Sequence, residues 1–320
     1  MNTTAVLLEQ PERIRLAQLD LIEPTPEDVV VEVQWSGIST GTERLLFDGS
    51  MPAFPGMGYP LVPGHESVGR VVVAGSASGH ETGEQVFVPG ANCYGLLNGQ
   101  PVRGLFGGAA SRLVVPGERV IQVDERLGEQ AVLLALAATA YHAVAGGGRI
   151  AKPRPPQLIV GHGVLGRLLA RLNVAAGYTD TTVWETNPLR QSGAEGYVVC
   201  NPQDDPRRDY AVICDVSGDA TLLDSLIGRL APDGEIILAG FYNQPLQFNF
   251  APAFMREARL RAAAEWKRPD LLAVQALLTE QRLSLDGLIT HLAPHAEADN
   301  AYRTAFGDAA CLKMVLDWTH

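Results

Sequence analysis

The chain has 320 residues, of which 46% are hydrophobic and 19% charged. This composition argues against disorder and leaves enough chain for two domains with substantial cores. Acidic residues number 36 against 25 Lys and Arg, giving a formal net charge of −11. A nucleic-acid groove and a polybasic membrane patch both need an excess of Lys and Arg on one face, which an acidic chain argues against. We therefore expect small molecules as partners.

The cysteines and the apolar runs exclude further classes. Four scattered cysteines without a C-x-x-C pair do not predict a disulfide framework or a structural zinc knot. Residues 1–16 read as a strand rather than a signal peptide. The most apolar run, 131–148, is interrupted by His142 and falls short of 18 unbroken apolar residues. We expect a buried helix there, no integral membrane segment, and a cytoplasmic protein.

The first segment, to about residue 136, is rich in Val between Gly and Pro residues, as in "DVVVEVQWSGIS", "SVGRVVVAG" and "SRLVVPGERVIQV". Short β-rich runs bounded by turn residues predict a mainly antiparallel, barrel-like domain.

From about residue 137 the pattern changes to strands that alternate with helices. The expected strands are "QLIV", "TTVWE", "YAVICDVSG" and "GEIILAGF", and "ATLLDSLIGRLAP" is expected to be a helix between the last two. This alternation predicts a parallel sheet with helical crossovers. Near residue 288 the pattern ends, and "EADNAYRTAF" and "CLKMVLDW" predict a helix and a strand that need not join that sheet.

The strongest local motif is the G-x-G-x-x-G stretch at 161–166, which follows the strand "QLIV" and opens an amphipathic helix. Gly161 allows a tight turn, Gly163 allows the backbone to approach a pyrophosphate, and Gly166 allows close helix–strand packing. The backbone N–H groups at the start of this helix, with Val164 and Leu165, are expected to hold the phosphates. Alternatively, the glycines only connect a strand to a helix.

Glu185 ends the next expected strand. A carboxylate there accepts hydrogen bonds from both hydroxyls of an adenosine ribose and repels a 2′-phosphate, which favours NAD over NADP. Alternatively, Glu185 is a solvated residue at a strand end, and the nearby Arg190 keeps NADP open.

Across nearly its whole length the chain resembles the medium-chain dehydrogenase/reductase superfamily. "PLVPGHESVGRVV", "GEQVFV", "ATAYHAV" and "DVSG…APDGEIILAGF" occur in the superfamily's order. The resemblance implies an α/β protein in which a GroES-like β-rich catalytic domain (1–136) precedes a Rossmann domain with a doubly wound parallel sheet (137–288). The C-terminal segment (289–320) would return to the catalytic domain. Thr139, on the helix between the domains, joins the expected cofactor site.

A narrower resemblance is carried by "GISTGTERLLFDG" and "LDGLITH…AYRTAFGDAACLKMVLDW". These stretches are similar to the dehydrogenases of bacteriochlorophyll synthesis, which oxidise the 3-(1-hydroxyethyl) group of a bacteriochlorophyllide to 3-acetyl. The resemblance implies a tetrapyrrole substrate, and we expect NAD as cofactor and a homo-oligomer. Two other classes stay open: a zinc-independent reductase of small enones or quinones, and a redox-inactive nucleotide- or ligand-binding protein.

The zinc enzymes of the superfamily hold their catalytic metal with three side chains. The corresponding positions here are Ser39, His65 and a residue near Ala135, so two of three ligands are missing. A catalytic zinc needs three protein donors, and we therefore expect no metal. Alternatively, Glu43 and Glu66 join His65 in an oxygen-rich metal site.

Without zinc, oxidation of an alcohol needs a protein group that accepts the hydroxyl proton. His65 has a suitable pKa range, and Glu66 is grouped with it as a catalytic candidate. Ser39 and Thr40 provide hydroxyls for a proton relay, and Tyr141 is the second choice as proton carrier. Alternatively, His65 is a vestigial ligand, the hydroxyls belong to an ordinary turn, and Tyr141 is a packing residue.

A loop at 47–63 combines apolar side chains with Gly and Pro. Phe47, Phe54, Met57 and Tyr59 predict a surface suited to a flat apolar macrocycle. Alternatively, these side chains pack the loop against its own domain.

Overall fold

The computed structural model describes residues 1–104, 106–150 and 152–320. The chain forms two compact units, one made of residues 1–134 with 286–320 and the other of residues 135–285. The domain limits expected at 136/137 and 288/289 remain predictions.

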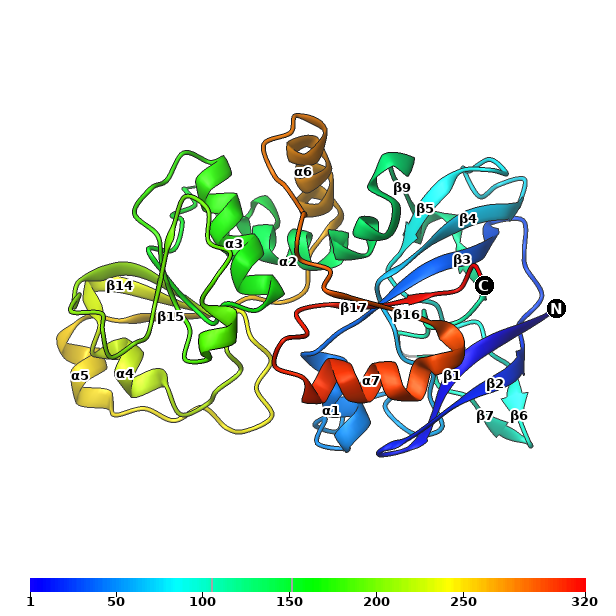
Figure 1. Ribbon diagram of the computed structural model, residues 1–320, viewed down its shortest axis with the longest axis horizontal. Helices are drawn as coiled ribbons and strands as arrows, with labels where there is room; N and C mark the ends of the chain where they lie inside the picture. The colour runs from blue at the N-terminus through cyan, green and yellow to red at the C-terminus, as the bar shows by residue number, and fades with distance from the viewer. Residues whose placement is uncertain (105, 151) are drawn as a thin grey trace. The chain divides into compact units, whose positions relative to one another are not determined.

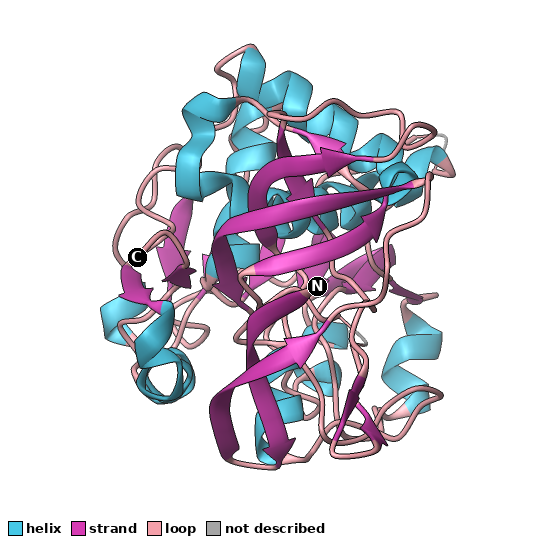
Figure 2. Ribbon diagram, turned by 90° about the vertical axis from the view of Figure 1, so that its right-hand side faces the viewer, coloured by secondary structure: helices cyan, strands magenta, loops and turns pink. Residues whose placement is uncertain are grey.

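The first unit is built mainly of strands (Figure 2). Its strands are β1 (Asn2–Gln10), β2 (Arg13–Asp20), β3 (Asp28–Ile38), β4 (Ser67–Ala74), β5 (Gln85–Val88), β6 (Leu96–Leu97), β7 (Gln100–Pro101), β8 (Arg112–Pro116), β9 (Ile121–Gln122), β16 (His291–Pro294) and β17 (Met314–Asp317). Its α-helices are α1 (Thr42–Asp48) and α7 (Ala298–Gly307).

The second unit alternates strands and helices (Figure 1). Its strands are β10 (Leu158–Val160), β11 (Thr182–Trp184), β12 (Val198–Cys200), β13 (Tyr210–Asp215), β14 (Leu230–Leu238) and β15 (Arg259–Ala262). Its α-helices are α2 (Leu134–Ala145), α3 (Val164–Ala175), α4 (Leu223–Ile227), α5 (Phe250–Met255) and α6 (Arg268–Thr279), where α2 starts one residue before the unit does.

A seven-stranded sheet organises the first unit, with β16-β17-β3-β4-β5-β9 in hydrogen-bonded order and β8 also paired to β3. The valines of β3 are buried because both β4 and β8 pair with that strand. The C-terminal strand β17 runs antiparallel to β3 and places Val315 opposite Gly37. The helix and strand expected near the C-terminus are thus confirmed as α7 and β17, which lie outside the parallel sheet.

A six-stranded, fully parallel sheet organises the second unit, in the order β12-β11-β10-β13-β14-β15. The chain leaves β10 first on one side, toward β11, and later on the other, toward β13. Such a reversal is where nucleotides bind in doubly wound folds. The expected α/β class, with a GroES-like unit and a Rossmann unit, is confirmed.

One helix is shorter than expected. The stretch "ATLLDSLIGRLAP" predicts a helix throughout, but α4 covers only Leu223–Ile227. Its continuation is extended because Leu230 already begins β14 and pairs with Tyr210 of β13. The sheet pairing therefore ends the helix after Ile227, with Gly228 as its C-cap.

The expected buried helix is α2. Within the described residues, one helical segment, Glu125–Gly148, is long and apolar enough to cross a membrane by length and composition alone, and 61% of its apolar window is buried inside the protein. A helix in the core of a globular protein is buried to a similar extent and passes the same test of length and composition.

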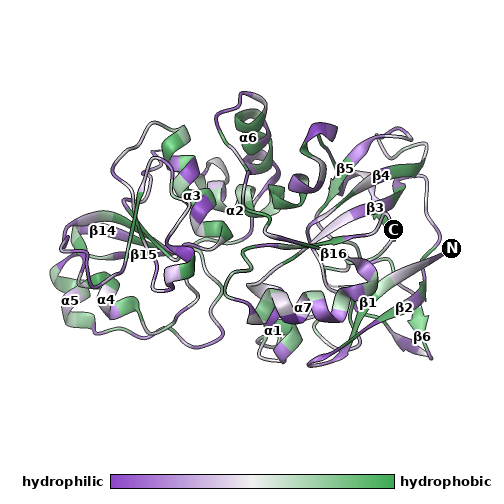
Figure 3. Ribbon diagram, in the orientation of Figure 1, coloured by the Kyte–Doolittle hydropathy of each residue, from purple (hydrophilic) through white to green (hydrophobic). Residues whose placement is uncertain are grey.

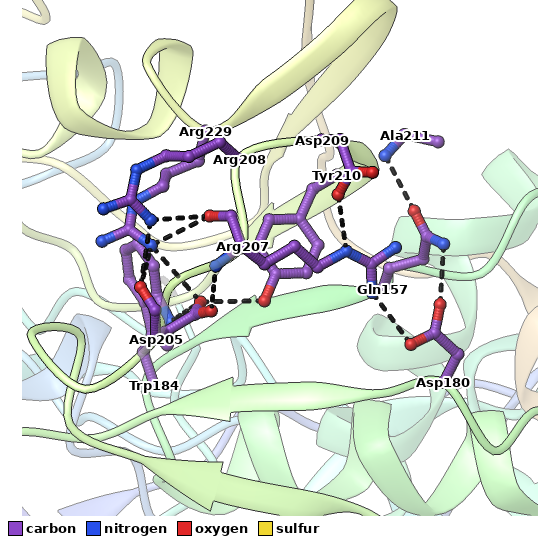
Figure 4. A network of polar contacts seen from close by, with 10 residues as sticks. All are labelled: Gln157, Asp180, Trp184, Asp205, Arg207, Arg208, Asp209, Tyr210, Ala211 and Arg229. Carbon is purple, nitrogen blue, oxygen red and sulfur yellow. Dashed lines mark hydrogen bonds and ion pairs between the residues drawn. The ribbon is translucent and has the colours of Figure 1, made fainter.

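A polar network holds the end of β11 in place (Figure 4). Asp205 accepts hydrogen bonds from the Trp184 indole at 2.7 Å and the Tyr210 hydroxyl at 2.8 Å. The Arg229 guanidinium stacks over Trp184 with its central carbon 4.8 Å from the ring centre. Because Trp184 is the last residue of β11, these contacts fix the point from which the next loop begins.

Candidate functional site

His65 lies between two buried carboxyl groups in the first unit. Its Nδ1 is 3.8 Å from Glu43 Oε1, and its Nε2 is 3.7 Å from Glu66 Oε1. The imidazole keeps 21% of its side chain exposed, whereas both carboxyl groups have no exposed surface. The Phe106 ring packs against it with 5.1 Å between ring centres. A proton on His65 would thus have a carboxylate near each ring nitrogen.

Glu43 is the most perturbed acid of this cluster. Burial, reinforced by the nearby Glu66 carboxylate, raises its pKa from 4.5 to about 7. Its oxygens accept hydrogen bonds from the Ser39 N–H at 3.1 Å and the Tyr302 hydroxyl at 2.9 Å. Glu43 therefore changes charge near neutral pH in the same cluster as His65.

Glu66 forms a buried ion pair with Lys313, which immediately precedes β17. The other oxygen of Glu66, Oε1, has no hydrogen-bond donor among the described residues. Gly37 makes room for the pair, because a Cβ at that position would lie 2.4 Å from Glu66 Oε2 and 2.8 Å from Lys313 Cε. A side chain larger than hydrogen at position 37 would force the Glu66 carboxylate and the end of the Lys313 side chain to shift from these positions.

The two hydroxyl residues predicted to form a relay, Ser39 and Thr40, differ in burial. Ser39 is buried and its Oγ accepts a hydrogen bond from Thr42 at 3.4 Å, whereas Thr40 is exposed. Tyr141 and Thr139 lie on α2 in the second unit, where the Thr139 hydroxyl donates to Ala135 O at 2.9 Å. Ser39 is tied to the Glu43–His65 cluster through its backbone N–H, which donates to Glu43, and not through its hydroxyl.

The residues at the zinc positions of the superfamily do not fit a metal. Ser39 offers a hydroxyl in place of a thiolate, and Ala135 is buried without any donor. Among the residues that the structure describes, no group of three or more His, Cys, Asp or Glu side chains is placed to hold a metal ion. Cys93 is buried, which raises the pKa of its thiol to about 11 and keeps it neutral.

The glycine loop turns tightly and packs closely against the start of α3. Gly161 has φ +105°, and a Cβ on Gly166 would lie 1.8 Å from Gly161 O. Gly163 caps α3, and a Cβ there would have no neighbour within 4 Å. Val164 and Leu165 form the first turn of α3. The loop thus leaves open space beside the helix N-terminus, where a pyrophosphate would be stabilised by N–H groups.

Glu185 lies beside that loop. Its Oε2 accepts a hydrogen bond from His162 N–H at 3.1 Å, and its Oε1 accepts one from Asn187 N–H at 2.8 Å. Each carboxylate oxygen has a second lone pair, so both can still accept a ribose hydroxyl.

The apolar side chains of the 47–63 loop are half-buried and pack against the core of the first unit. Phe47 contacts Phe306 with 5.3 Å between ring centres, and the Tyr59 hydroxyl donates to Leu46 O at 2.5 Å. Phe54 and Met57 pack against the same core. The contacts agree with the packing interpretation, and a substrate role for these residues remains a proposal.

Sequence reasoning missed Lys313 and Tyr302. The one available signal was the charge of Lys313 inside the apolar strand "CLKMVLDW", because a lysine in a buried strand needs a partner. Tyr302 carried no comparable signal, since tyrosines on helices are usually packing residues.

Known proteins resemble the chain over its whole length. Residues 25–125 match the family model described as the alcohol dehydrogenase GroES-like domain. The chain is 55% identical to the 2-desacetyl-2-hydroxyethyl bacteriochlorophyllide A dehydrogenase of Cereibacter sphaeroides over 318 residues, which cover 99% of both proteins. The protein of the same name from Rhodobacter capsulatus is also 55% identical, again over 99% of both.

A solved structure confirms the fold independently. The 2R,3R-butanediol dehydrogenase of Bacillus subtilis superposes with a TM-score of 0.82 at 21% identity, covering 98% of this chain and 99% of that one. The order of motifs, the two units and the full-length identity agree with one another. The chain belongs to the medium-chain dehydrogenase/reductase superfamily and, within it, to the family of bacteriochlorophyllide a dehydrogenases of bacteriochlorophyll synthesis.

Proposed function

We propose that the protein is an NAD-dependent alcohol dehydrogenase that oxidises the 3-(1-hydroxyethyl) group of a bacteriochlorophyllide to 3-acetyl. The observation that carries this proposal is the 55% identity over 99% of both chains with a dehydrogenase named for a hydroxyethyl bacteriochlorophyllide. Zinc has no part in the proposed reaction, because the residues at the metal positions do not supply three donors.

The reaction removes a hydride from the carbinol carbon and a proton from its hydroxyl, which leaves a carbonyl. A bound nicotinamide cofactor supplies the hydride acceptor. His65 accepts the proton, and the carboxyl groups of Glu43 and Glu66 stabilise the imidazolium that forms. Ser39 provides a hydroxyl beside this cluster, and Thr40 and Tyr141 remain secondary candidates for proton transfer.

NAD is proposed as the cofactor because of the Glu185 carboxylate beside the glycine loop. Gly161, Gly163 and Gly166 would shape the pyrophosphate site, with Val164, Leu165 and Thr139 around it. The half-buried Phe47, Phe54, Met57 and Tyr59 are proposed to contact the macrocycle.

The test is turnover of a hydroxyethyl chlorin with NAD or NADP by purified native protein and by His65→Ala and Glu185→Ala variants. The native protein should produce the acetyl chlorin with NAD and bind NADP much more weakly. His65→Ala should lose about 10²–10⁴-fold in turnover while keeping nucleotide affinity, because it removes only the proton acceptor. Glu185→Ala should narrow the preference for NAD.

Three outcomes would contradict the proposal in separate ways. Reduction of small enones or quinones with NADPH, without chlorin oxidation, would favour a reductase. Nucleotide binding without turnover of either substrate class would favour a binding protein. Near-native turnover and an unchanged pH profile in His65→Ala would transfer the proton-accepting role to Ser39, Thr40 or Tyr141.

A homo-oligomer is proposed to form through the β15 edge of the parallel sheet. Helix α5 beside this edge is mostly hydrophobic (Figure 3), and Phe250, Phe254 and Met255 are exposed by 71%, 65% and 76%. An apolar patch next to an edge strand with one paired side suits a second copy of the same strand. Light scattering should detect a multimer that Phe254→Glu dissociates, and a monomeric native protein would refute this.

A further inference from the structure

His162, the middle residue of the G-x-G turn, uses all its polar groups to hold neighbouring segments. Its N–H donates to Glu185 Oε2 at 3.1 Å, and its carbonyl accepts from Arg167 Nε at 3.1 Å. Its Nδ1 is 2.6 Å from Arg190 O, and its Nε2 is 2.9 Å from the Tyr197 hydroxyl. The side chain has no exposed surface, so these contacts replace its hydration completely.

The partners define the state of the ring. A carbonyl only accepts, so Nδ1 must carry the hydrogen that bonds to Arg190 O. Burial lowers the pKa of His162 to about 4, which keeps the ring neutral at physiological pH. Nε2 is therefore an acceptor, and Tyr197 donates its hydroxyl hydrogen to it. Only one ring orientation satisfies both bonds.

Arg167, on the first turn of α3, holds the loop that follows Glu185. Its Nη2 donates to Arg190 O at 3.1 Å and Ser192 O at 2.9 Å, besides the bond from Nε to His162 O. Gly193 has φ +81°, and a Cβ there would lie 2.6 Å from Arg167 Nη1. The guanidinium is buried and bound to three carbonyls, which leaves it badly placed to serve a phosphate.

We propose that His162, Arg167 and Tyr197 act as positioning residues that fix the Glu185 carboxylate against the glycine loop and thereby set the preference for NAD over NADP. The His162 N–H holds one oxygen of the carboxylate and the Asn187 N–H holds the other, which opposes rotation of the carboxylate away from an incoming 2′-phosphate. The electrostatic repulsion between the carboxylate and that phosphate is therefore retained. The same orientation presents its free lone pairs to the ribose hydroxyls. This inference rests on the nucleotide preference proposed above.

The test is a calorimetric titration with NAD and NADP of the native protein and of Tyr197→Phe, His162→Ala and His162→Asn variants. Tyr197→Phe and His162→Ala should reduce the ratio of the two affinities by about tenfold, the effect of one positioned hydrogen bond. His162→Asn should restore part of the ratio, because its amide can still donate to Arg190 O. Tyr178→Phe, at an exposed tyrosine of the same unit, is the matched control and should leave the ratio unchanged.

The outcomes separate this inference from the proposed function. A native protein with equal affinity for NAD and NADP would refute the nucleotide preference itself. If the native protein prefers NAD and folded Tyr197→Phe and His162→Ala keep the same preference, the positioning role is overturned and the nucleotide preference stands. Equal weakening of both nucleotides, with the ratio intact, would also overturn it, because that is the result of a general structural defect. If His162→Ala does not fold, the affinity ratio of Tyr197→Phe alone tests the positioning role.

Discussion

Removal of the Lys313 ammonium should destabilise the protein severely, because it leaves a buried carboxylate without its cation. In Lys313→Met the Glu66 carboxylate keeps full burial, and its Oε1 already lacks a donor among the described residues. Breaking a buried ion pair from one side costs about 3–5 kcal/mol. The loss should be larger at pH 8 than at pH 6, because Glu43, with a pKa of about 7, becomes a second buried anion in the same cluster.

Urea unfolding at both pH values, followed by tryptophan fluorescence, measures this loss. The double variant Glu66→Met/Lys313→Met should recover most of the stability, since replacing both partners by apolar groups is often nearly neutral. Lys152→Met, at an exposed lysine, is the matched control and should change stability by less than about 0.5 kcal/mol. If Lys313→Met behaves like Lys152→Met, or if the double variant is no more stable than the single one, the reasoning fails.

Three further experiments concern the Glu43 carboxyl group, the glycine loop and the metal content. Glu43→Gln should remove one pH dependence of the free energy of unfolding. The Glu43 carboxyl group keeps its proton up to about pH 7 in the folded state, but only up to about pH 4.5 in the unfolded chain. Native stability should therefore fall by about 3 kcal/mol as pH rises through that window, and the variant should lack this contribution in urea titrations. Gly166→Ala should lose both stability, by about 1–3 kcal/mol, and NAD binding, because its Cβ would meet Gly161 O. Gly163→Ala should lose NAD binding without losing stability, because its Cβ would meet no protein atom. If this variant binds NAD as tightly as the native protein, the pyrophosphate lies elsewhere. Elemental analysis should find no stoichiometric zinc and chelators should leave turnover unchanged, whereas one tight zinc per chain would implicate His65, Glu66 and Glu43 as ligands.

The parts that sequence predicted well are those with local causes. The strand, glycine turn and helix around Gly161 were predictable because turn chemistry and hydrophobic periodicity act over a few residues. The His65 signature was visible for the same reason. Lys313 and Tyr302 were not, because the chain next to β17 and helix α7 bring them to Glu66 and Glu43 from the opposite end of the sequence. The length predicted for α4 was wrong because the helix is ended by the pairing of β14 with β13, which no local sequence signal shows.

The small size of Gly37 restricts which residues other members of this family can have at three positions. The side chains at positions 37, 66 and 313 share one small volume, so a larger residue at position 37 displaces the other two side chains. A relative with Ala or a larger residue at position 37 should lack the acid–lysine pair, and a relative with the pair should have glycine. A sequence alignment of the family should therefore show the three positions changing together, even though they lie on different strands or loops and far apart in the chain.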